Sequence, residues 1–203
     1  MTPSKLVLLL TAATFAAPVA KAQDAGTQAP PQMSAAEQEM MQKYMKAATP
    51  GPEHQKLAKL AGKWKLQFTS WFAPGAPPQK SEGNAEFKAV LGGRYVQQEV
   101  KGDMGGQPFE GMGTMGFDNV TKERFATWTD SMSTGLMVMR GKCPADAKKC
   151  TTKGHMSDAI AGKEVAFSET TTMTDDDHFT LELRGPGPDG KQFKMMEIVY
   201  TRQ

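Results

Sequence analysis

The feature that most constrains the fold is the regular spacing of turn residues from Lys63 onward. Short runs in which apolar and polar residues alternate are separated by clusters of Gly, Pro, Asn and Asp. This pattern is typical of antiparallel strands joined by short turns. The chain contains about ten such runs. None alternates with a long helical segment, which disfavours a parallel βαβ arrangement. Because closure removes the sheet edges, residues 62–203 are predicted to form an all-β, up-and-down barrel.

The segment before the barrel is predicted to be helical over residues 34–61. Ser34 and Glu37 have the spacing of a capping box. The helix that follows carries an apolar stripe on one side, which predicts either packing against the barrel or docking of a partner. We favour packing. The stripe consists of Met40, Met41, Tyr44 and Met45. After Pro50, a second short helix is expected from Pro52, because proline suits an early helical position.

The N-terminus has the three parts of a secretory signal peptide over residues 1–22. Lys5 gives the basic start, Leu6 to Ala20 is an apolar stretch, and Ala20 to Ala22 provides a small-x-small cleavage pattern. The apolar stretch is shorter than the ~20 residues that a membrane span needs, so we expect cleavage rather than anchoring. Residues 23–33 are small and polar and are expected to be a disordered leader. The sequence therefore predicts a periplasmic or secreted protein.

Signal cleavage also changes the charge. Lys5 and Lys21 leave with the signal, so the 24 basic residues fall to 22 and equal the 22 acidic residues. The remaining chain has no basic cluster with interleaved aromatic residues. We therefore expect no nucleic-acid partner and no membrane span after cleavage. The sequence does not identify a protein partner.

The chain has two cysteines, Cys143 and Cys150. An even pair at short spacing in an oxidising compartment predicts a disulfide across a hairpin turn. Closing such a short loop contributes about 2–3 kcal/mol on the chain-entropy model. A metal pair would need further ligands nearby, and a redox motif would need tighter spacing.

Gly62-Lys63-Trp64 at the start of the first strand resembles the Gly-x-Trp signature of lipocalins and the wider calycin barrels. In that group an Arg near the last strand stacks on the Trp, and the resemblance implies this structural role for Arg202. The stretch from about Gly51 to Arg202 is more specifically similar to domain of unknown function 1579. The blocks that carry this resemblance include GKWKLQ, LGGRYVQQE, PFEGMGTMGFDNV, TWTDSMSTG and GPDGKQFKMMEIVYTR. The resemblance implies a calycin-like barrel and brings no established activity.

Trp128 and Asp130 share one face of a predicted strand, and Met137 and Met139 share one face of the next. An aromatic wall with one polar group suits a small-molecule pocket, and it also suits an ordinary core with a turn-capping Asp. Methionine fills irregular apolar space or lines adaptable cavities. With Met115, these residues are our candidates for contacting a small apolar or amphipathic ligand.

The sequence contains none of the usual catalytic motifs, so we expect a binding protein rather than an enzyme, with no cofactor and no metal. A catalytic alternative would use Asp130 or Glu99 as a base. A haem alternative, by analogy with calycin relatives, would use His155 or His178. A copper alternative would use the methionines around the cysteine hairpin as soft ligands. A structural or interaction module with residues 34–48 docking on a partner is the remaining alternative.

Overall fold

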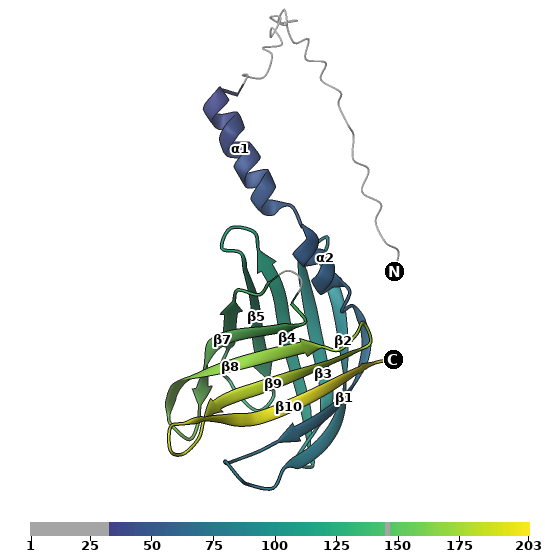
Figure 1. The fold of residues 1–203 in the computed structure, drawn as a ribbon, viewed down its shortest axis with the longest axis vertical. Coiled ribbons are helices and arrows are strands. Elements are labelled where there is room, and N and C mark those ends of the chain that lie inside the picture. Colours follow the sequence, from purple (N-terminus) through teal and green to yellow (C-terminus); the bar gives the residue numbers. More distant parts are fainter. Residues whose placement is uncertain (1–32, 145–146) are drawn as a thin grey trace, which may run out of the picture.

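The structure is a computed structural model that describes residues 33–144 and 147–203. Figure 1 shows two helices leading into one barrel of strands. The signal peptide predicted over residues 1–22 lies outside the described residues, as does nearly all of the predicted leader. Within the described part of the chain, no helix is long and apolar enough to cross a membrane.

Two helices precede the barrel. The first, α1 (Ala35–Ala48), starts at the predicted capping box: the Ser34 hydroxyl accepts from the Glu37 amide, and the Glu37 carboxylate accepts from the Ser34 amide at 2.7 Å. The second, α2 (Pro52–Ala58), has proline in its first turn. Its Leu57 is buried in the barrel core.

The apolar stripe of α1 does not pack on the barrel. Helix α1 buries none of its residues, and it extends away from the strands in Figure 1. Only its C-terminal end is tied to barrel loops, where the Asn119 side-chain amide donates to the carbonyls of Ala47 and Thr49. The packing that we favoured is therefore wrong, because periodicity identifies an apolar side but not what covers it.

Ten antiparallel strands form a closed barrel in which every strand pairs with its sequence neighbours and the first pairs with the last. This confirms the predicted all-β, up-and-down barrel preceded by short helices. The strands are β1 (Gly62–Ser70), β2 (Gln79–Val90), β3 (Tyr95–Met104), β4 (Gln107–Asp118), β5 (Glu123–Asp130), β6 (Met137–Gly141), β7 (Lys149–Asp158), β8 (Lys163–Met173), β9 (His178–Pro186) and β10 (Gln192–Arg202).

The alternation in β1 directs Trp64, Leu66 and Phe68 into the core, each at most 3% exposed. Phe72, which an unbroken two-residue period would place on the same face, is 76% exposed. Strand β1 ends at Ser70, so the two-residue period no longer applies at position 72. Phe72 instead lies at the end of the barrel opposite α2.

An aromatic cluster fills the barrel at the α2 end. Trp64 contacts Phe179 edge to face at 5.0 Å between ring centroids, and Phe179 stacks on Tyr200 at 4.1 Å. The Trp64 indole donates to the carbonyl of Leu60 at 2.9 Å. The Arg202 guanidinium lies 4.2 Å from the Trp64 ring centroid, and it also donates to backbone carbonyls just before β1. The cluster thus joins the two strands that close the barrel.

The two cysteines form a disulfide, as predicted. Cys143 and Cys150 are bonded across the connection between β6 and β7, with their Cα atoms 5.3 Å apart. This connection lies at the same end of the barrel as α2, where β6 ends and β7 begins. The bond therefore fixes one loop at the rim of the barrel, and Cys150 itself is buried.

Candidate functional site

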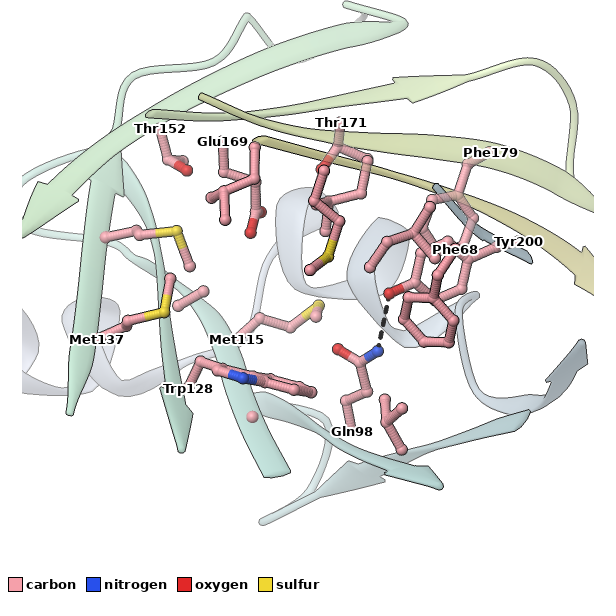
Figure 2. Close-up of a pocket in the computed structure, with 18 of the residues that line it drawn as sticks. Phe68, Gln98, Met115, Trp128, Met137, Thr152, Glu169, Thr171, Phe179 and Tyr200 are labelled. Carbon is pink, nitrogen blue, oxygen red and sulfur yellow. Dashed lines mark hydrogen bonds between the residues drawn. The ribbon is translucent and has the colours of Figure 1, made fainter. Parts of the chain in front are cut away.

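The barrel encloses a cavity of about 870 Å³. Its wall is mainly apolar, and methionine and aromatic side chains from most of the strands face inward (Figure 2). Leu57 and Leu60 approach it from the helical lead, and Phe72 and Met132 border it at the opposite end. Strand alternation accounts for this arrangement, because every second residue of each strand points into the barrel. The interior is therefore hollow and not filled solid by side chains.

The five residues predicted to contact a ligand all border this cavity. Trp128 from β5, Met115 from β4, and Met137 and Met139 from β6 lie along the wall, and Asp130 lies where β5 ends. Met139 is the most enclosed of them, at 3% exposed. The structure thus brings these five side chains together around one space.

Trp128 is held flat against the barrel wall by its neighbours. Gly111 and Gly113 on β4 lie under its indole ring, and a Cβ atom at Gly111 would overlap that ring. The indole NH donates to Asp130 Oδ2 at 2.9 Å. Asp130 Oδ1 in turn accepts from the amide of Met132 at 2.9 Å. Asp130 therefore orients the ring and caps a turn, which leaves it engaged rather than free to act as a base.

Two buried polar side chains, one from β3 and one from β10, are hydrogen-bonded to each other at the cavity. The Gln98 side-chain amide donates to the Tyr200 hydroxyl at 3.1 Å, and both residues are buried (Figure 2). Loss of hydration raises the pKa of Tyr200, and the nearby Glu169 carboxyl raises it further. Tyr200 therefore stays neutral at physiological pH. The pair satisfies two polar groups that would otherwise be costly to bury.

Glu169 is the functional candidate that sequence reasoning missed. Its carboxyl projects from β8 into the cavity (Figure 2). Loss of hydration raises the pKa of Glu169 to about 7. A detectable signal existed, because Glu169 is two residues after the buried Phe167 and so belongs to the inward face of β8. Its acidic side chain is the exception on a face that otherwise reads as apolar or neutral, from Val165 and Phe167 to Thr171 and Met173.

Thr152 is the cross-strand partner of Glu169 on β7 and also faces the cavity. Its side-chain hydroxyl is buried and has no hydrogen-bond partner among the described residues. Buried hydroxyls are usually paired, so this one marks a polar position that the protein leaves unsatisfied. Together, Glu169 and Thr152 form a polar patch on an otherwise apolar wall.

The catalytic and haem alternatives find little support in the geometry. Glu99 faces outward, between Gln98 and Val100, and its carboxylate lies 3.7 Å from the Lys88 ammonium. His155 is exposed on the outer face, and the His178 ring bonds Asp175 at 2.9 Å. The three histidines all lie in the described residues, and none of them lines the cavity. Glu99 therefore cannot serve as a base in the cavity, and neither histidine is placed to hold a haem there.

The methionines named for a copper site are divided between the two faces of the barrel wall. Met132, Met137, Met139 and Met156 border the cavity, whereas Met112 is on the outer face and is 51% exposed. Over residues 33–144 and 147–203, no three His, Cys, Asp or Glu side chains gather as a metal site would require. The methionines that face the cavity give its wall soft, adaptable apolar surface.

Comparison with known proteins places this barrel in a family. Residues 49–202, more than half of the chain, match the model of a family described as a protein of unknown function (DUF1579). The chain belongs to the DUF1579 family. This confirms the resemblance seen between about Gly51 and Arg202. The match begins just before α2 and ends with β10, so the DUF1579 unit comprises α2 and the whole barrel.

Solved structures with a similar fold are distant in sequence. The crystal structure of Rv2717c from M. tuberculosis gives a TM-score of 0.59 at 15% identity, covering 76% of this chain and 99% of that one. A de novo designed fluorescence-activating β-barrel gives 0.42 at 15% identity, covering 72% and 96%. A redesigned barrel, mFAP1, bound to DFHBI gives 0.40 at 16% identity, covering 75% and 100%. A comparison with curated proteins finds no significant match. The likeness to Rv2717c shows the shared barrel fold.

Proposed function

We propose that this DUF1579 protein binds a small, largely apolar molecule inside its barrel. The observation that carries the proposal is the cavity of about 870 Å³, which lies within the 300–1,000 Å³ range typical of small-molecule sites. Its lining of methionine and aromatic side chains suits an apolar body, and its few polar groups suit the orientation of one end. Trp128, Asp130, Met115, Met137 and Met139 are the proposed contacts, together with Glu169.

We also propose that the protein works outside the cytoplasm, after loss of residues 1–22. The Cys143–Cys150 disulfide supports this, because disulfides persist in oxidising compartments. A binding protein in the periplasm or beyond would hold apolar molecules that dissolve poorly in the surrounding water. No cofactor is required for such a role.

Cavity filling provides the test of ligand binding. We expect N-phenyl-1-naphthylamine, a neutral apolar dye, to bind saturably at one site per chain. Thr171 lines the cavity, so Thr171→Trp should weaken dye binding by about tenfold or more through loss of volume. Thr172 points to the other face of the same strand, so Thr172→Trp is the matched control and should bind like wild type. Dye fluorescence measures both affinities.

If the dye does not bind saturably to the wild type, or if both variants lose dye affinity equally, the ligand site is not in the barrel interior. Native mass spectrometry of protein purified from the periplasm gives a second measurement. A small molecule that co-purifies and is lost from the Thr171→Trp variant supports the proposal. A clean apo mass favours the second candidate described next.

The second candidate function is a docking role for α1. Its stripe residues Met40, Met41, Tyr44 and Met45 are each at least 50% exposed. Exposed apolar residues that gather on one helical side are typical of partner-binding helices. If α1 acts in this way, the barrel serves as its support. Replacing the four stripe residues by glutamine should then abolish binding of the partner protein and leave dye binding unchanged.

A further inference from the structure

Glu169 is an acidic group that the cavity itself leaves without a counter-charge. Loss of hydration is the sole cause that raises the pKa of its carboxyl, and no hydrogen bond or cation among the described residues offsets it. Its immediate neighbours across the sheet are Thr152 on β7 and Leu183 on β9, neither of which carries charge. The ionised form of a carboxyl in such surroundings is strongly stabilised by any hydrogen-bond donor or cation that enters the cavity.

The basic residues that border the cavity lie at its ends, where four of them are exposed: Lys56, Lys59, Lys80 and Lys148. Arg124 on β5 pairs with Glu53 of α2, with 3.1 Å between its Nη2 and the carboxylate. Arg202 is bound to Trp64 and to backbone carbonyls at the α2 end. Tyr200 faces the interior but remains neutral. Since none of these groups neutralises Glu169, a cation for this carboxyl would have to come from a ligand.

We propose that the cavity selects amphiphilic amines, with the protonated amine paired to Glu169 and the apolar body against the methionine and aromatic wall. This inference rests on the proposed ligand-binding function and names its ligand class. The unpaired hydroxyl of Thr152 stands beside Glu169 in the sheet, so a small rotation would let it accept a second hydrogen from the ammonium group. Three ammonium hydrogens can use several acceptors at once, which suits this patch.

The test compares three ligands that share one chain length: octylamine, 1-octanol and octanoate. Each displaces N-phenyl-1-naphthylamine from the full-length protein at pH 8. We expect octylamine to bind at least about tenfold more tightly than octanol, as a charge-assisted hydrogen bond replaces a neutral one. Octanoate should bind most weakly, because its charge repels that of Glu169.

Glu169→Gln keeps the shape of the side chain and removes its charge, so the octylamine-to-octanol affinity ratio should fall close to one. Near-UV circular dichroism verifies that this variant is folded. Glu164→Gln is the matched control, since Glu164 lies on the exposed outer face of the same strand, and it should keep the wild-type ratio. Because octanol provides the reference in each protein, a general change in affinity cancels.

A wild-type pH series tests the same inference without a mutation. Octylamine stays protonated between pH 8 and pH 5, whereas Glu169 gains its proton in that interval. The affinity ratio should therefore fall as the pH is lowered. If dye and octanol bind but octylamine has no advantage, or if Glu169→Gln keeps the advantage, the amine inference is wrong and ligand binding stands. If neither dye nor octanol binds, the proposed function fails.

Discussion

Trp64→Ala is expected to lower the free energy of unfolding by about 3–5 kcal/mol, the range for removing a fully buried large aromatic side chain. Trp64 is 0% exposed and lies among Phe87, Phe179 and Tyr200. The alanine variant would leave a void in this cluster and would remove the surface on which Arg202 lies. Because domains are stable by only about 5–15 kcal/mol, this loss is a large share of the total. Chemical denaturation at neutral pH measures it.

Phe72→Ala is the matched control for the loss of Trp64. It also removes an aromatic ring close in sequence, but that ring is 76% exposed. The expected change is within about 0.5 kcal/mol, as for surface substitutions in general. Similar losses in the two variants would show that the Trp64 cluster does not carry the stability assigned to it.

Glu169→Gln is expected to flatten the pH dependence of stability. In the folded protein the pKa of Glu169 is about 7, above its ordinary value of 4.5. A raised folded pKa means that the folded state binds the proton more tightly than the unfolded state. The stability that this group contributes is therefore fully present below about pH 4.5 and is lost as the pH rises through about 7. The wild type should therefore lose about 2–3 kcal/mol between pH 5 and pH 8 through this one group.

The measurement compares unfolding free energies of both proteins at pH 5 and pH 8. Glu169→Gln should be more stable than wild type at pH 8, with a smaller difference at pH 5. Glu164→Gln removes an exposed carboxyl from the same strand and should follow the wild-type curve. Equal pH dependence in Glu169→Gln and wild type would mean that water in the cavity hydrates the carboxylate fully.

Much of the barrel could be predicted from the sequence because strands have a simple two-residue period. That period, with turn residues between the runs, predicts both the strand count and the inward direction of Trp128, Met137 and Met139. Cysteine spacing predicts the disulfide for a similarly local reason. These are properties of a few consecutive residues, and local sequence determines them.

The features that the sequence did not predict depend on parts of the chain that are distant in sequence. Phe72 follows the end of β1, and nothing near it in sequence shows that pairing with β10 ends at Ser70. The α1 stripe has helical periodicity, but no local pattern tells whether a second surface meets it. Glu169 is a different case, because the strand period predicts its inward direction, whereas its isolation from any cation depends on residues of other strands.

Barrel closure has a consequence for how the chain reaches its folded state. Strand β1 pairs with β10, and the carbonyl of Ala61 is bonded to Arg202, 141 residues later. Bringing such distant segments together costs chain entropy before any contact is gained, so closure is expected to be slow. Until β10 has been synthesised, β1 can pair only with β2 and presents an open hydrogen-bonding edge. The newly made chain is therefore most vulnerable to pairing with other chains just before its last strand arrives.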